Sequence, residues 1–347
     1  MAMSTAARPV LAQAGCAASP GHRRLSRHAL TVLAAAILSS GAQAQEPLYV
    51  KNLSPVAGLF GLPSQRNADI GPAGSFGLAA HTSIASHYVS EVRGNEALNL
   101  DGETLRVALE LRYALTDNWD LQLELPWLDH SGGDLDSLID NWHDFWGMSD
   151  GGRSRAAQDL LDYRYQGSDT FDLRDASSGM GDSTLSLSYR LYHDKAASAA
   201  LVAGYKFSTG DEDEFTGSGS DDAFVALRFS GDHLADLPLR WHGQMGYLRA
   251  GQSELIAHMQ ERDLWFAGLT VDWLITPAWS LIGQLDAHAA PTDSGIDGLG
   301  EDAIMLTVGG RWRFAERWTV DISVVEDVQV ETAPDVAFQA SLRYRAN

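Results

Sequence analysis

Charged side chains stand at alternate positions in many segments of this sequence. Between residues 103 and 113, Arg106, Glu110 and Arg112 share one parity, while Leu105 and Leu109 share the other. Guanidinium and carboxylate groups on one face can pair with each other, or can bind and select charged solutes. The candidates for such a polar lining are Arg106, Glu110, Arg112, Glu124, Arg190, Arg228, Arg240, His242, Asp272, Asp286, Arg311, Arg313, Asp321 and Arg343.

Many of these arginines lie near the same end of their segments. A basic zone at that end would favour anionic solutes. The alternative is a network of internal salt bridges that keeps the interior closed, since each arginine has acids within reach on neighbouring segments. Both interpretations stay open. The arginines concerned are Arg112, Arg190, Arg228, Arg240, Arg311, Arg313 and Arg343.

The histidines and serines form no recognisable catalytic arrangement. No serine stands in a nucleophile motif, and His130 and His143, which lie among aspartates, show no metal-ligand spacing. We therefore predict no catalytic residue, no metal site and no cofactor. An enzyme that acts on lipid from a hidden site is kept as a less favoured alternative.

The elements that would position the polar face are β-strands. An even number of strands, joined alternately by short turns and long loops, is typical of a transmembrane barrel. We therefore predict an all-β fold over residues 75–347, a transmembrane antiparallel up-and-down β-barrel of about 12 strands. The alternating segments are 76–88, 103–113, 119–127, 183–193, 199–208, 222–230, 239–248, 264–275, 279–288, 302–314, 318–325 and 336–345.

Tryptophan placement favours a membrane barrel over a soluble one. Most Trp residues lie at or near strand ends with the parity of the apolar face, which predicts aromatic girdles at the membrane interfaces. A soluble β-sandwich or lipocalin-like barrel is the alternative, but its apolar face would point inward. The girdle candidates are Trp119, Trp127, Trp241, Trp265, Trp273, Trp279, Trp312 and Trp318.

Residues 1–44 are typical of a secretory signal peptide. Arginines without a single acid precede the short apolar stretch 29–38, and Ala42-Gln43-Ala44 offers a cleavage site. Export predicts the outer membrane of a Gram-negative bacterium, with outer-membrane lipid and, during biogenesis, the barrel-assembly machinery as partners. The net charge of −21 argues against nucleic acid as a partner.

Residues 45–74 do not alternate. They combine glycine, proline and several apolar residues, which an exported chain should not leave in water. We expect this segment to tuck into the barrel or its mouth, either as a plug or gate, or as a simple N-terminal latch.

The longest predicted loop, 129–182, carries an apolar stripe with helical spacing. We predict a short amphipathic helix there, in an extracellular loop, that constricts or caps the barrel, with a position on the membrane surface as the alternative. The acids of this loop and of 209–222 are either a solvated rim or a site for divalent cations, although no calcium-loop spacing occurs. The constriction-helix candidates are Leu135, Leu138, Ile139, Trp142, Phe145 and Trp146.

Two sets of short motifs resemble known families. Asn52-Leu53-Ser54-Pro55 and Gly61-Leu62-Pro63-Ser64, followed by Ala73-Gly74, resemble the start of a proteobacterial family of unknown function whose members are predicted outer-membrane barrels. That resemblance covers nearly all of the chain after the leader. Gly179-Met180-Gly181-Asp182 and Ser208-Thr209-Gly210-Asp211 are similar to loops in outer-membrane transporters for aromatic compounds. The resemblance implies a barrel and no established site residues.

The functional hypothesis is a narrow or gated outer-membrane channel for a small-molecule solute. The alternative is a closed structural or interaction barrel that works through acidic outer loops.

Overall fold

A computed structural model describes residues 45–133, 160–234, 237–328, 332–334 and 336–346. The chain divides into two compact units, Met1–Gln43 and Ala44–Asn347, and the second contains all of these residues. The predicted signal peptide, residues 1–44, and the predicted constriction helix both lie outside the described residues.

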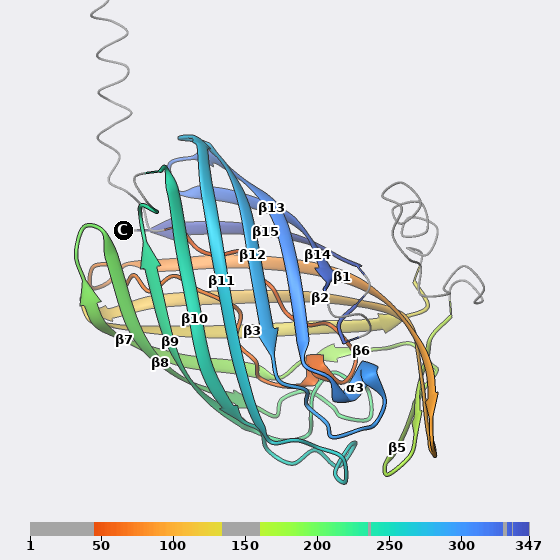
Figure 1. Cartoon of the computed structure of the whole chain (residues 1–347). Coiled ribbons are helices and arrows are strands. Elements are labelled where there is room, and N and C mark those ends of the chain that lie inside the picture. The colour runs from red at the N-terminus through yellow and green to blue at the C-terminus, as the bar shows by residue number, and fades with distance from the viewer. Residues whose placement is uncertain (1–44, 134–159, 235–236, 329–331, 335, 347) are drawn as a thin grey trace, which may run out of the picture. The chain divides into compact units, whose positions relative to one another are not determined.

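Twelve antiparallel strands close into a barrel, as predicted (Figure 1). Each strand pairs with its neighbours along the chain, and β1 closes the barrel by pairing with β15, from Phe76 opposite Ala346 to Ser86 opposite Val336. The barrel strands are β1 (Phe76–Arg93), β2 (Glu96–Thr116), β3 (Trp119–Ser131), β7 (Ser183–His193), β8 (Ala197–Phe207), β9 (Asp222–Gly231), β10 (Leu239–Arg249), β11 (Asp263–Thr276), β12 (Trp279–His288), β13 (Ala303–Ala315), β14 (Trp318–Asp327) and β15 (Val336–Ala346).

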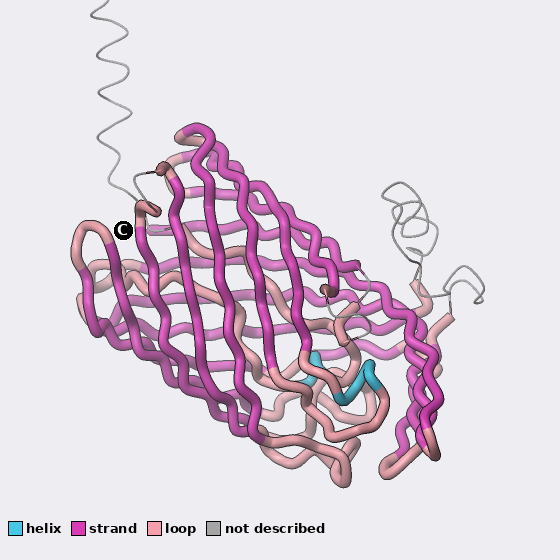
Figure 2. Tube along the Cα trace, in the orientation of Figure 1, coloured by secondary structure: helices cyan, strands magenta, loops and turns pink. Residues whose placement is uncertain are grey.

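Short turns and long connections gather at opposite ends of the barrel. The turn end carries the connections 117–118, 194–196, 232–238, 277–278 and 316–317. The loop end carries the described residues between β3 and β7, those of 328–335, the connections 208–221, 250–262 and 289–302, and one tight turn at 94–95. Ribbon and tube views show the loops and the short helices together at one end (Figure 2).

One predicted connection is wrong. Residues 89–102 were expected to form a long loop, but β1 and β2 continue through them and join by a tight turn at residues 94–95. They continue because they gain further partners. The short strands β4 (Asp162–Gln166) and β5 (Thr170–Leu173) extend the sheet beside β2, with Ala97 opposite Gln166.

A third short strand, β6 (Ser177–Met180), lengthens the wall next to β3. It pairs with residues 127–130 of β3, while β7 pairs with residues 119–124 of the same strand. The peptide N–H of Gly181 bridges the gap by donating to the Pro126 carbonyl at 2.9 Å. Pro126 has no N–H, so it contributes only its carbonyl to the hydrogen bonds between the strands.

The barrel is apolar outside and polar inside. Leu109 on β2 is 58% exposed, whereas its neighbours in the alternation, Ala108 and Glu110, are 0% and 8% exposed. Large apolar side chains point outward all around the wall, among them Leu111, Leu125, Val225, Met245, Leu269, Leu285, Val308, Ile322 and Leu342. A soluble barrel would hide this face, so the lipocalin-like alternative fails.

The tryptophans lie near the rims of the wall. Several near the turn end contact other aromatic rings, and Trp279 stacks on Trp312 with ring centroids 5.5 Å apart. Trp127 and Trp265 lie toward the loop end. Trp119, Trp127, Trp265, Trp273, Trp279, Trp312 and Trp318 are exposed, and Trp241 is half-buried.

Helical structure is minor in the described residues. The 3-10 turn η1 (Ala57–Leu59) lies in the N-terminal segment, and α3 (Asp297–Gly300) lies between β12 and β13. None of the helices described is long and apolar enough to cross a membrane.

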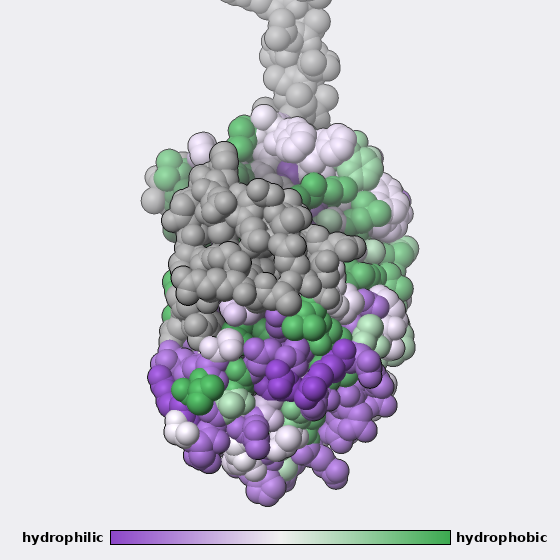
Figure 3. Space-filling model, turned by 90° about the vertical axis from the view of Figure 1, so that its right-hand side faces the viewer, coloured by the Kyte–Doolittle hydropathy of each residue, from purple (hydrophilic) through white to green (hydrophobic). Residues whose placement is uncertain are grey.

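The loop end has its own apolar core. Val56, Leu59 and Phe60 of the N-terminal segment pack there with side chains from β1, β2, β4, β5 and the surrounding loops, including Tyr163 and Met259. Seen from the side that carries the β4–β5 hairpin, hydrophilic side chains gather over the lower half of the view (Figure 3). The loop end therefore combines a polar surface with an apolar interior.

Candidate functional site

The candidate site is the lumen, and the chain's own residues 45–74 occupy it. Leu48, Tyr49, Val50, Leu53 and Arg66 of this segment are all less than 5% exposed. Figure 1 shows the segment as a red-to-orange trace inside the ring of strands.

The segment enters at the turn end, reaches the loop end and returns. At the turn end, Glu46 pairs with Arg112 and Arg345, each at 3.0 Å. At the loop end, the Asn52 amide lies 3.0 Å from His288 Nε2. After η1 the chain runs back, and the Ala73 N–H donates to Asp117 in a turn-end connection at 2.8 Å.

Local sequence explains this path. Pro47, Pro55 and Pro63 cannot donate to a strand ladder, so the segment does not join the wall. Its first arm still alternates. Leu48 and Val50 pack on an apolar patch formed by β1 and β12–β15, while Tyr49 and Lys51 point to the polar side chains of β2 and β3.

Charges on the segment meet opposite charges on the wall. Lys51 Nζ lies 3.5 Å from Glu124 Oε1, and Arg66 pairs with Glu110. Glu124 also accepts a hydrogen bond from the Tyr49 hydroxyl at 3.0 Å. Buried ions are stable only when paired in this way, so wall and segment complement each other.

Tyr49 is the aromatic anchor of the first arm. Its ring stacks on His81 with centroids 3.9 Å apart and an interplanar angle of 8°. The guanidinium carbons of Arg66 and Arg106 lie 5.3 Å and 5.6 Å from the centroid of the same ring. Cation–π contacts of this kind add to the ion pairs around Glu124.

A second anchor lies near the loop end, at Lys206. Its ammonium group is 2.6 Å from Asp182 and 3.2 Å from Asp222, and it donates to the Leu59 carbonyl at 3.1 Å. Asp222 in turn accepts the Gly61 N–H at 2.8 Å. This cluster ties the turn of the segment to β7, β8 and β9.

Beside the Arg66–Glu110 ion pair, hydrogen bonds from amide, hydroxyl and backbone groups hold the returning arm. The Gln65 amide donates to Asp286 Oδ1 at 2.7 Å, and Thr270 donates to Gln65 Oε1 at 3.0 Å. The Ala68 N–H donates to Ser230 Oγ at 2.9 Å.

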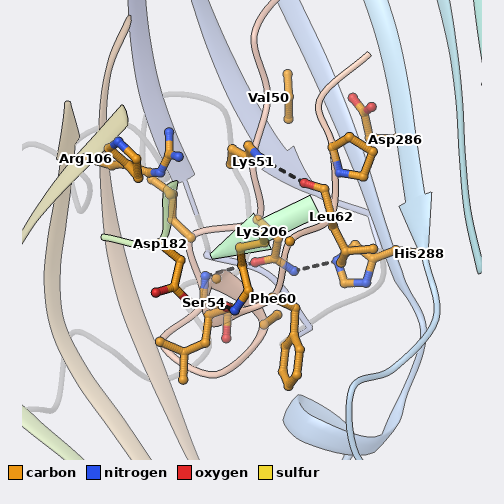
Figure 4. A pocket seen from close by; sticks show the side chains of 18 of the residues that line it. Val50, Lys51, Ser54, Phe60, Leu62, Arg106, Asp182, Lys206, Asp286 and His288 are labelled. Carbon is orange, nitrogen blue, oxygen red and sulfur yellow. Dashed lines mark hydrogen bonds and ion pairs between the residues drawn. The ribbon is translucent and has the colours of Figure 1, made fainter. Parts of the chain in front are cut away.

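A small cavity remains between the segment and the wall (Figure 4). Lys51, Arg106 and Lys206 line one part, and Asp286 and His288 line another. Its volume is about 70 Å³, room for a few water molecules. In this arrangement the lumen is filled rather than open.

The turn-end arginines divide into paired and unpaired groups. Arg311 donates to both oxygens of Asp321, at 2.6 and 2.9 Å, and Arg343 donates to Asp321 at 3.0 Å. Arg112 is bonded to Asp120 as well as to Glu46. By contrast, Arg313 has no ion pair to any described residue. Ion-paired arginines and an arginine without an ion pair therefore lie together at this end.

The structure places all of the predicted lining residues on the inward parity of their strands. Arg106, Glu110, Glu124, Arg228, His242, Asp272, Arg311 and Asp321 are buried, while Arg112, Arg190, Arg240, Asp286, Arg313 and Arg343 are half-buried.

Sequence reasoning missed the residues of the segment that meet them. These are Glu46, Tyr49, Lys51 and Arg66, together with the wall acids Asp182 and Asp222. Lone charges in an otherwise apolar, proline-rich stretch were the available signal, because such charges need partners once buried. No group of His, Cys, Asp or Glu that could hold a metal ion occurs within the residues described.

The inside-out barrel with a polar, occupied lumen defines an outer-membrane β-barrel fold. The chain belongs to a family of proteins of unknown function, DUF3187, whose model matches residues 25–346. The predicted resemblance to such a family is thereby confirmed. No curated protein matches the chain.

One solved structure with a TM-score above 0.5 supports the same fold. The COG4313 outer membrane channel from Pseudomonas putida F1 is 15% identical with a TM-score of 0.53, over 80% of this chain and 97% of that one. The Ralstonia pickettii toluene transporter TbuX is 12% identical with a TM-score of 0.37, over 88% and 95% of the two chains. At these identities the likeness concerns the fold alone.

Proposed function

We propose that this protein is a gated channel for a small solute in the outer membrane of a Gram-negative bacterium, with residues 45–74 as its plug. It works without catalysis or a cofactor. The loop end faces outward, and the turn end, where residues 45 and 346 lie, faces the periplasm.

The observation that carries the proposal is the chemistry of the wall behind the segment. Arg106, Glu124, Lys206 and Asp286 contact the segment through hydrogen bonds and ion pairs, Arg106 through the Tyr49 hydroxyl. These groups keep favourable partners when water replaces the segment. A permanent filler would be expected to rest on an apolar wall, whose exposure to water is costly. Here the apolar contacts are limited to the patch under Leu48, Val50 and Leu53 and to the loop-end core.

Planar-bilayer recording tests this function. The variant lacks residues 48–70, so that Pro47 joins Gly71. Both residues lie toward the turn end, and every strand of the wall is retained. We expect brief or small currents from the chain beginning at Gln45 and larger, steady currents from the deletion variant.

A closed structural barrel is the second candidate, and the small cavity and the apolar loop-end core favour it. Silence from both proteins, each shown to be a folded barrel by heat-modifiable gel migration, would contradict the channel and support this alternative.

A further inference from the structure

Neighbouring strands bring five charged or titratable residues together at the turn end of the lumen. The register sets Arg240 on β10 directly opposite Asp272 on β11, and His242 lies two residues along from Arg240. Arg311 and Arg313 share the inward parity of β13. Arg311 Nη1 lies 3.6 Å from Asp272 Oδ2. We call Arg240, His242, Asp272, Arg311 and Arg313 the β10–β13 patch.

This patch holds buried hydrogen-bonding atoms that lack partners. Arg240 Nη1, Arg311 Nη1, Arg313 Nε and His242 Nε2 are buried and make no hydrogen bond to any described residue. His242 and Arg311 are only 4% and 2% exposed. Buried donors without acceptors are rare and costly, so several in one place point to a missing acceptor.

The charge balance of the patch points to an anion. Arg240 and Arg311 are charged groups near enough to act on Arg313. Asp321 is already shared by Arg311 and Arg343, and the acid nearest to Arg240 in the ion pairs, Asp232, lies 3.4 Å away and is 42% exposed. Arg313 therefore lacks an ion pair to any described residue, and Asp272 is the one carboxylate within the patch itself.

Asp272 adds a requirement of its own. It is 1% exposed, and neither of its carboxylate oxygens accepts a hydrogen bond from the described residues. A ligand that fits must therefore accept from guanidinium groups and also donate to a carboxylate. Inorganic phosphate does both at neutral pH, because it keeps at least one proton, whereas sulfate keeps none.

We propose that the β10–β13 patch is a binding site for inorganic phosphate. Guanidinium groups donate readily to phosphate oxygens, often as bidentate partners, and the phosphate O–H donates to Asp272. Arg240 and Arg313 are half-buried, so the site is reached from the turn-end mouth. This binding deepens the proposed function, and rests on it only for the consequence that phosphate is the transported solute.

Isothermal titration of the folded chain in detergent, at pH 7.5, tests the proposal. Phosphate is compared with sulfate, which cannot donate to Asp272, and with methyl phosphate, which has mostly lost its last proton at this pH and carries no other hydroxyl group. We expect phosphate to bind at least 10-fold more tightly than either anion, because each interaction lost is worth about one decade in Kd.

Variants assign the binding to this patch. Arg240→Gln and Arg313→Gln should each weaken phosphate binding about 10-fold, and Asp272→Asn should bring the phosphate and sulfate affinities together. Arg317→Gln is the matched control, since it removes the same charge from an exposed turn at the same end. It should bind like the unaltered chain.

Two results would overturn the proposal. One is that the folded, unaltered chain binds no phosphate, so that water alone fills the patch. The other is an equal loss of phosphate affinity in Arg317→Gln and Arg313→Gln. That result would mean that phosphate is attracted by the overall charge of the turn end and not by the β10–β13 patch. Phosphate binding with a silent bilayer would reject the channel and keep the site, whereas currents without binding would do the reverse.

Discussion

At the scale of single residues, ion pairs between segment and wall are the main polar hold on the lumen. Arg66 is 1% exposed and Glu110 is 8% exposed, so neither group is well hydrated. Removing one member of a buried pair leaves the other without its counter-charge, which costs far more than the loss of an exposed pair.

Arg66→Met should therefore destabilise the folded protein by about 3–5 kcal/mol. The change strands the carboxylate of Glu110 in the lumen. Unfolding in urea, followed by tryptophan fluorescence in detergent or lipid, measures the loss.

Arg174→Met provides the matched control for that experiment. Arg174 pairs with Asp172 on the loop end, where their side chains are 56% and 49% exposed. The expected cost is about 0–1 kcal/mol. Equal losses for the two variants would mean that the segment is not held by buried pairs.

At the scale of elements, the strands follow from the sequence because their partners are close along the chain. Alternation alone predicted twelve segments whose bounds lie within a few residues of the barrel strands. The extension of β1 and β2 over residues 89–102 was missed because its partner β4 lies more than 60 positions further on in the sequence, as Asn99 with Arg164 shows. Residues 45–74 were harder still, since their partners come from many different strands.

Substitutions on the outward face of β2 test directly whether this face contacts lipid. Leu109 lies in the middle of the strand and is 58% exposed. Leu109→Arg should cost about 2–4 kcal/mol in lipid, because a cation at the membrane midplane is poorly solvated.

The control for this substitution lies on the same strand and face. Leu115, at the turn end, is 47% exposed. Leu115→Arg should cost about 0–1 kcal/mol, because the headgroup region solvates the charge. The measurement is urea unfolding in lipid vesicles. An unchanged free energy of unfolding in both variants would argue that the wall does not face a bilayer.

One carboxylate links the turn of the β4–β5 hairpin to the connection between β10 and β11. Asp169 accepts the backbone N–H groups of His258 and Met259, at 2.9 and 3.0 Å, and lies 2.7 Å from His258 Nδ1. Asp169→Asn should therefore speed hydrogen exchange in residues 162–173 and 256–260 at least several-fold while leaving the barrel strands unchanged.

Mass spectrometry of hydrogen exchange measures this effect. Asp172→Asn, an exposed position on β5, is the control and should leave the exchange rates as they are. Faster hydrogen exchange that extends through the barrel strands would contradict a local role for Asp169.

At the scale of the whole molecule, the chain closes its own lumen. The sequence predicted that residues 45–74 would be buried near the barrel, but it did not decide between a plug and a latch. The pattern of residues in this segment does not show which strands it contacts. The same limit applied to the basic end, where only the three-dimensional pairing separates the arginines with carboxylates from those without.

The most direct test of the gated channel is a reversible tether between plug and wall. A Cβ placed on Gly61 would lie 3.0 Å from Lys206 Cβ, so a small adjustment brings two cysteines into disulfide range. The only cysteine of the chain, Cys16, lies in residues 1–44 and is absent from a chain that starts at Gln45.

Single-channel conductance of Gly61→Cys, Lys206→Cys should be recorded in one bilayer before and after a reductant is added. The account predicts no large openings while the disulfide holds the plug, and their appearance once it is reduced, with each single-cysteine variant insensitive to the reductant. Identical large currents in both states, with the disulfide verified by mass, would contradict the claim that residues 45–74 gate the lumen.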